Sequence, residues 1–201
     1  MRRILWLIPC LIFSSILCAQ TQGGIEQYHY IGGSNANAIV PVVHLQSKKG
    51  WYGEARYNYD EKNTFSLLGG KTFSGEKKMN WSITPMIGIA FGEMNGYTMG
   101  INFSAEINHF FFNTQSQYTI TTTSKYNNYF FNWSELGYQP LNWLYGGISI
   151  QHTMVSQEKG LMEPGVLLGI TVKNVSFPFY LFNTFSNNRF FILGVNWEWK
   201  H

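Results

Sequence analysis

The sequence has few charged residues and is rich in aromatic ones. Only 12% of its 201 residues are Asp, Glu, Lys or Arg, against roughly 25% in an average soluble domain. The hydrophobic fraction is an ordinary 45%, while aromatic residues reach 17%. Uncharged polar residues and aromatic rings have replaced charge, which indicates a surface that faces something other than water.

Cysteine is absent from almost the whole chain. Cys10 and Cys18 both lie in the first twenty residues, MRRILWLIPCLIFSSILCAQ, which combine two arginines, a short apolar run and a site similar to that of signal peptidase. The run is shorter than the ~20 residues of a spanning helix, which argues against a retained anchor. Leu17 is too large for lipid attachment at Cys18. We predict a signal peptide at 1–19 and a single domain without disulfides at 20–201.

Removal of this leader also removes most of the net positive charge. The whole chain carries 14 Lys and Arg against 11 Asp and Glu, a net charge of +3. Arg2 and Arg3 lie in the leader and no acidic residue precedes Glu26, which leaves twelve basic residues against eleven acidic ones. A net charge of +1 gives no support for a nucleic-acid partner.

Long apolar runs and amphipathic helical patterns are also missing after the leader. Instead, segments of about ten residues with alternating polarity recur, separated by turns rich in Gly and Asn. The twelve segments are 26–33, 38–46, 51–60, 64–73, 81–91, 97–109, 116–124, 129–139, 143–153, 163–172, 175–183 and 189–199. They predict an all-β domain.

Residues 97–109 show the two faces of such a segment. Every second residue, from Tyr97 through Ile101 to Ile107, is apolar, while the intervening residues from Thr98 to Asn108 are small or polar. Successive side chains of a strand point to opposite faces, so this segment has one apolar and one polar face.

Alternation alone also fits a soluble β-sandwich, but three features favour a transmembrane barrel. About ten residues cross a membrane as a tilted strand, whereas most strands have five or six. The polar faces carry small uncharged residues, and aromatic residues gather at segment ends as in interfacial girdles. The expected girdle residues are Trp51, Trp81, Tyr97, Tyr129, Trp143, Trp197 and Trp199. We predict an antiparallel barrel of about twelve strands, with ten as the alternative and short loops on both sides.

Four prolines lie inside the predicted strands: Pro41, Pro85, Pro164 and Pro178. Proline donates no backbone hydrogen bond, and a closed barrel has no free edge to place it on. We therefore expect these prolines at bulges or near strand ends.

With these features the chain resembles the small outer-membrane β-barrel proteins of Gram-negative bacteria, by overall pattern rather than by a motif of one characterised family. Such proteins usually end in an aromatic strand that the barrel-assembly machinery recognises. The residues that resemble this strand are Phe191, Leu193, Val195, Trp197 and Trp199, although Lys200 and His201 follow them. The resemblance implies the bacterial outer membrane, with its lipids and the assembly machinery as partners.

The segment WYGEARYNYD (51–60) places charges among aromatic residues. Alternation directs Trp51, Gly53, Ala55, Tyr57 and Tyr59 toward lipid, and Tyr52, Glu54, Arg56, Asn58 and Asp60 toward the lumen. The charged residues that we place in the lumen are Glu54, Arg56, Glu106, Glu135 and Glu198. Because one guanidinium can bridge two carboxylates, we predict a network in which Arg56 bonds at least one of Glu54, Glu106 and Glu135. The excess of carboxylates would bias passage toward cations.

No pattern of residues indicates catalysis or metal binding. The histidines do not combine with a nucleophile and an acid as in hydrolases, and no His pair has metal-ligand spacing. The glycine-rich stretches lack the Lys-Ser/Thr and the helix of a phosphate loop. We expect no catalytic residue, no cofactor and no metal.

Three functions remain open: a narrow channel for small solutes, a structural or partner-binding barrel with a side-chain-filled lumen, and a lipid-acting barrel enzyme. The short external loops argue against a receptor, an adhesin or a plugged transporter. The width of the lumen distinguishes the first two functions.

Overall fold

A computed structural model describes residues 21–33 and 37–200, so the predicted signal peptide lies outside the described residues. Within these ranges the chain forms strands joined by turns, and no helix is long and apolar enough to cross a membrane. The strands are β1 (Thr21–Gly32), β2 (Ile39–Ser47), β3 (Trp51–Tyr57), β4 (Thr64–Lys71), β5 (Phe73–Glu76), β6 (Asn80–Gly92), β7 (Gly96–Ile107), β8 (Phe110–Thr121), β9 (Tyr129–Leu141), β10 (Leu144–Val155), β11 (Leu161–Val172), β12 (Val175–Phe182) and β13 (Phe190–Lys200).

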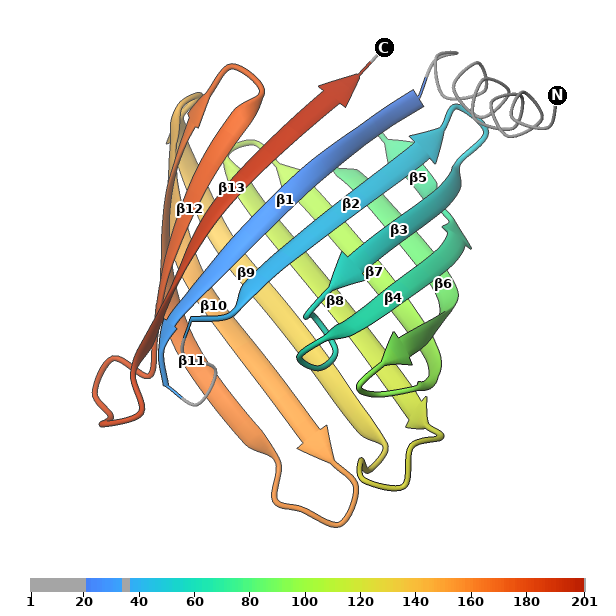
Figure 1. Cartoon of the computed structure of the whole chain (residues 1–201). Coiled ribbons are helices and arrows are strands. Elements are labelled where there is room, and N and C mark those ends of the chain that lie inside the picture. The colour runs from blue at the N-terminus through green and yellow to red at the C-terminus, as the bar shows by residue number, and fades with distance from the viewer. Residues whose placement is uncertain (1–20, 34–36, 201) are drawn as a thin grey trace, which may run out of the picture.

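The strands close into an antiparallel barrel (Figure 1). The first strand pairs with the last along its whole length, from Gln22 opposite Lys200 to Gly32 opposite Phe190. β4 and β5 both pair with β6 and are two parts of one strand that is interrupted at Thr72. The thirteen segments therefore make twelve strands, which confirms the predicted fold class and strand number.

The two ends of the barrel differ. Thr21 and Lys200, the two ends of the described chain, lie at the same end, where the strands are joined by turns of two or three residues (Figure 1). We call this the terminus end. Most of the longer connections, such as 58–63, 122–128 and 183–189, lie at the opposite end, the loop end. This asymmetry is typical of outer-membrane barrels, whose periplasmic turns are short.

Strand positions match the predicted segments, with the largest difference at β8. This strand begins at Phe110 rather than at residue 116, because Asn108 and His109 alone form the turn that joins it to β7. Asn108 adopts a positive φ of 54°, which a tight hairpin turn requires and asparagine tolerates. The alternating segment 97–109 predicts a strand through both residues.

Two of the four prolines are not where we expected them. Pro41 and Pro164 lie near the starts of β2 and β11, as predicted. Pro85 lies inside β6, opposite the interruption between β4 and β5. Pro178 lies inside β12, where the pairing with β13 is missing between Ser176 and Phe179. The missing N–H therefore opens the ladder locally, without a bulge and without a change of register.

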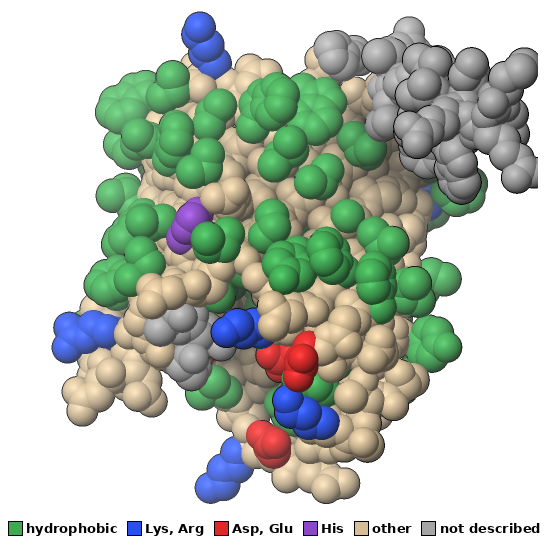
Figure 2. All heavy atoms as spheres, in the orientation of Figure 1, with side chains coloured by type: hydrophobic (Ala, Val, Ile, Leu, Met, Phe, Trp, Pro, Cys, Tyr) green, Lys and Arg blue, Asp and Glu red, His purple; other side chains and the backbone are tan. Residues whose placement is uncertain are grey.

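The outer face of the barrel is apolar over most of its height. Hydrophobic side chains cover the visible face, and the charged side chains on it lie mainly below this band (Figure 2). Ile87 is 74% exposed and Leu168 57% exposed. Such exposure would be costly in water, so this face suits lipid.

Five of the predicted girdle residues lie exposed on this outer face: Trp51, Trp81, Tyr97, Trp143 and Trp197. Trp199 is half-buried at the terminus end and contacts the ring of Trp197. Tyr129 differs from the prediction, because its hydroxyl bonds Asp60 and it therefore points into the lumen.

One region of the outer face is polar. Thr114, Ser116, Asn132 and Ser134 project outward near the middle of β8 and β9, because alternation places their neighbours in the lumen. The Asn132 amide donates to both Thr114 Oγ1 and Ser116 Oγ at 2.9 Å, and Ser134 Oγ donates to Asn132 Oδ1 at 2.9 Å. These mutual bonds satisfy groups that lipid could not.

The two faces of β13 provide a direct test of the barrel. Val195 is 44% exposed on the outer face, while the neighbouring Asn196 donates to the Tyr28 hydroxyl inside the lumen. Val195→Lys should cost about 2–4 kcal/mol because it places an ammonium group in lipid. Asn196→Lys, the matched control, should cost much less because Glu198 lines the same lumen. The measurement is the fraction of heat-modifiable, folded protein after refolding into vesicles, and equal losses would show that the faces are misassigned.

Candidate functional site: the barrel lumen

The lumen contains a cavity in the half nearest to the chain termini. Its volume is about 1000 Å³, and its wall includes residues of that end such as Gln22, Lys173 and Lys200. It reaches inward to Arg56 and Trp133, near the middle of the barrel. This cavity is large enough for a small-molecule ligand.

The half of the lumen nearest to the loop end is closed by packed side chains. Thr64, Thr119, Phe182 and Ile192 point inward there and are 0% exposed. One side of this closure is apolar and consists of Trp133, Leu167, Tyr180, Phe182, Phe190 and Ile192. The other side is polar.

The polar side is organised around Arg56, which is only 2% exposed. Its Nε donates to Glu54 on the same strand, and its Nη1 donates to Gln117 Oε1 on β8 at 2.6 Å. The guanidinium also lies over the ring of Tyr59, 4.3 Å from its centroid. A buried cation needs such partners because it has lost its hydration.

Two residues of the connection between β3 and β4 complete this polar side. Tyr59 OH donates to Gln115 Oε1 at 2.8 Å. Asp60 Oδ1 accepts from Tyr129 OH at 2.5 Å and from Gln117 Nε2 at 2.6 Å. Because β8 and β9 lie several strands away from β3, these bonds span the lumen. We call the group the cross-lumen network: Glu54, Arg56, Tyr59, Asp60, Gln115, Gln117 and Tyr129.

The position of Tyr59 corrects a sequence prediction. Alternation directed Tyr59 toward lipid and Asn58 toward the lumen. Asn58 instead adopts a positive φ of 57° and uses its side chain at the barrel rim, where it donates to the Ile39 carbonyl at 3.0 Å and accepts from Asn63 N at 2.7 Å. The strand pattern ends at Tyr57, so both Tyr59 and Asp60 turn inward.

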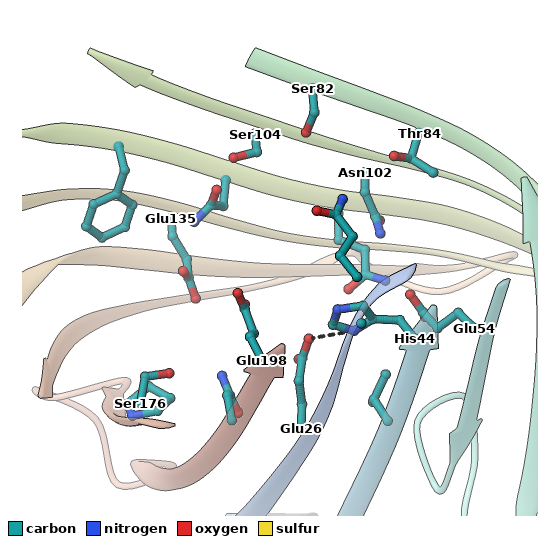
Figure 3. Close-up of a pocket in the computed structure, with 18 of the residues that line it drawn as sticks. Glu26, His44, Glu54, Ser82, Thr84, Asn102, Ser104, Glu135, Ser176 and Glu198 are labelled. Carbon is teal, nitrogen blue, oxygen red and sulfur yellow. Dashed lines mark ion pairs between the residues drawn. The ribbon is translucent and has the colours of Figure 1, made fainter. Parts of the chain in front are cut away.

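All five charged residues that the sequence places in the lumen line the cavity, but the structure brings only two of them together. Glu54 and Arg56 form an ion pair. Glu106, Glu135 and Glu198 lie nearer to the terminus end, and none of them pairs with a cation among the described residues. Figure 3 shows the glutamates of the cavity wall, with Glu26 paired to His44 at 3.4 Å.

Sequence reasoning missed the contributions of Gln115 and Gln117. Glutamine is uncharged, so a search for charged residues does not find it. Gln115 lies 56 residues from its partner Tyr59, and Gln117 lies 61 residues from its partner Arg56. The only available signal was the inward parity of these residues within a predicted strand.

Two glycines keep aromatic rings flat against the cavity wall. Phe111 is paired with Gly137, and Tyr145 is paired with Gly169. A Cβ on either glycine would come within 2.1 Å of the facing ring. The absence of a side chain therefore lets each ring lie on the neighbouring strand instead of projecting into the lumen.

The described residues offer little for catalysis. They contain no group of three His, Cys, Asp or Glu side chains that could hold a metal ion. The hydrogen bonds and ion pairs of their histidines go to Gln27, Glu26 and the Gln139 carbonyl, and none joins a histidine to a hydroxyl.

Known structures share this architecture. The KdgM porin aligns with a TM-score of 0.60 at 11% identity, over 88% of this chain and 98% of that one. The NanC porin aligns with a TM-score of 0.58 at 10% identity, over 87% and 98%. The chain has the fold of an outer-membrane porin. No protein-family profile and no curated protein matches the sequence, so the likeness is one of fold.

Loss of the buried ion pair between Arg56 and Glu54 should reduce stability much more than loss of the exposed pair between Lys125 and Glu93. Arg56→Met leaves the Glu54 carboxylate buried without its cation, at a cost on the order of 3–5 kcal/mol. Lys125→Met removes the exposed pair with Glu93 and should change stability little. Urea unfolding of the vesicle-inserted barrel measures both. Similar midpoints for the two variants would mean that Arg56 is hydrated rather than buried.

The packing of aromatic rings against glycines predicts that an added side chain at these glycines causes a steric clash. Gly169→Ala places a methyl group against the Tyr145 ring and should destabilise the barrel by about 1–3 kcal/mol, the usual cost of overpacking. Gly69→Ala is the control, because a Cβ there meets nothing within 4 Å. Thermal unfolding in detergent provides the measurement, and equal stability of both variants would contradict the close packing of Tyr145 on Gly169.

Proposed function

We propose that the protein is a narrow channel for small polar solutes in the outer membrane of a Gram-negative bacterium. The observation that carries this proposal is the polar cavity that opens at the terminus end and leads to the cross-lumen network. A purely structural barrel has no need of a solvated cavity of about 1000 Å³. The similarity in fold to the KdgM and NanC porins supports the same reading.

The membrane location rests on the outer face and on the last strand. The apolar outer face supports a lipid environment, and the short turns support a periplasmic position for the terminus end. Val195 and Trp197 alternate with lumen-facing residues in β13, which fits an aromatic last strand of the kind that the barrel-assembly machinery recognises. Outer-membrane lipids and this machinery are therefore the proposed partners.

Passage requires a rearrangement of the loop half. There, the polar side of the closure includes Tyr59 and Asp60, which belong to a connection rather than to a strand. The apolar side is carried by strands that are paired on both edges. Withdrawal of residues 58–63 is therefore the movement that disturbs the fewest backbone hydrogen bonds.

A second candidate is a closed barrel that binds a partner at the terminus end. The observation that favours it is the dense packing of the loop half, in which Phe182 and Ile192 are 0% exposed. Such a barrel would hold the same cavity without conducting.

Planar-bilayer recordings distinguish these candidates. We expect wild-type protein to conduct in small, cation-selective steps, because carboxylates predominate in the cavity. The double variant Tyr59→Ala and Asp60→Ala removes two anchors of the cross-lumen network and should raise the conductance at least twofold. Lys62→Ala, an exposed neighbour in the same connection, should leave it unchanged.

The recordings can also contradict the channel. If neither the wild type nor the double variant conducts, although both give the heat-modifiable band of a folded barrel, the lumen is sealed and the second candidate stands. Conductance that the double variant leaves unchanged would show that solutes do not pass the cross-lumen network.

A further inference from the structure

The two walls of the cavity differ in chemistry. One wall, built from β1, β9, β12 and β13, carries glutamates and aromatic rings. Its members are Glu26, Tyr28, Trp133, Glu135, Tyr180 and Glu198. The facing wall, built from β6 and β7, presents hydroxyl and amide groups, including Ser82, Thr84, Asn102 and Ser104 (Figure 3). A ligand in this space meets glutamates and π-systems on one side and mostly neutral polar groups, together with Glu106 of β7, on the other.

The aromatic rings form a continuous group beside the carboxylates. The rings of Tyr28 and Trp133 lie 5.6 Å apart between centroids, and those of Trp133 and Tyr180 lie 5.1 Å apart. Glu135 lies against Tyr180, and Asn196 beside Tyr28. All three rings line the cavity beside negative side chains, with Trp133 and Tyr180 largely buried by their mutual packing.

The glutamates of this wall lack enough cations. Glu135 and Glu198 have no ion-pair partner in the described part of the chain. Glu26 and Glu135 are close enough for their charges to interact. His44 is paired with Glu26, Arg56 is already engaged by Glu54 and Gln117, and Lys173 and Lys200 are exposed at the cavity mouth. A cation from solution would relieve the repulsion between these carboxylates.

The cation that fits is organic rather than metallic. No three acidic or histidine side chains among residues 21–33 and 37–200 converge as metal ligands do. The Asn196 amide oxygen is buried without a donor in the described structure, which adds an acceptor on the same wall. Separated carboxylates beside aromatic rings are the usual environment of bound ammonium groups.

We propose that this cavity binds small organic cations, with a protonated amine or quaternary ammonium group held between the carboxylates of Glu135 and Glu198 and the rings of Tyr28, Trp133 and Tyr180. In the channel proposed above, this site would select the solute before it reaches the cross-lumen network. Binding itself does not depend on passage.

The proposal separates this protein from a structure that shares its fold. One structure is described as the KdgM porin in complex with disordered oligogalacturonate, at a TM-score of 0.60 and 12% identity. Oligogalacturonate is a polyanion, which the unpaired Glu135 and Glu198 would repel. Two barrels with the same fold can therefore bind different solutes, because the residues of the lumen determine the sign of the charge that is accepted.

Titration of the refolded, detergent-solubilised barrel with choline tests the site. Binding is followed by calorimetry and by the change in tryptophan fluorescence, since Trp133 lines the cavity. The neutral isostere 3,3-dimethyl-1-butanol has the same shape as choline and no charge, and digalacturonate supplies the opposite charge. We expect saturable choline binding, at least tenfold weaker binding of the isostere, and none of digalacturonate.

Matched variants locate the site. The double variant Glu135→Gln and Glu198→Gln should weaken choline binding at least tenfold, whereas Glu158→Gln, in an exposed connection, should not change it. Each variant is first shown to fold by its heat-modifiable band. If the double variant does not fold, Glu198→Gln alone is used, because Glu198 is exposed at the barrel end and should weaken binding at least threefold.

The results separate this proposal from the channel. Equal binding of choline and its neutral isostere, preference for digalacturonate, or unchanged binding in the glutamate variants would overturn the site. Choline binding without bilayer conductance would keep the site and defeat the channel. Conductance without choline binding would keep the channel and defeat the site.

Discussion

The structure depends on one constraint: every backbone N–H and C=O group inside the membrane needs a partner within the protein. Lipid offers none, so a spanning sheet must close on itself. The pairing of β1 with β13 provides this closure. Pro85 and Pro178 open one ladder only locally, and the register continues on both sides, so closure is preserved. Closure then fixes which side chains enter the lumen.

This constraint explains what the sequence could predict. Lipid on one side and a polar lumen on the other impose a two-residue period, so the strand number and the outward direction of Trp51 and Trp197 follow from alternation. The period fails where the backbone leaves the strand. Asn58 has a positive φ, and the next two residues enter the lumen together. The two-residue period does not distinguish the faces of β9, because polar residues lie on both: Asn132 on the outer face and Glu135 in the lumen.

The candidate site was less predictable than the fold, because it depends on contacts across the barrel. The charge on Glu135 or Glu198 can be read from the sequence, and so can its direction. The sequence does not reveal that Arg56 bonds Gln117 rather than a second carboxylate, because this contact joins strands that approach from opposite sides of the lumen. Packing of Tyr145 on Gly169 is equally hidden, although it keeps the cavity open.

In the proposed channel, the two halves of the lumen would divide the work of a selective pore. In the terminus half, rings lie against the wall and the unpaired Glu135 and Glu198 face the cavity, so the proposed site would attract and hold cations there. In the loop half, an apolar side fixed to paired strands meets a polar side anchored by a connection. Within the cross-lumen network, Tyr59 and Asp60 belong to the connection and can move without breaking the sheet, and their bonds are of a kind that water can replace. In such a channel, substitutions in the terminus half would alter selection by charge, and substitutions in the loop half would alter passage, with no change in the barrel itself.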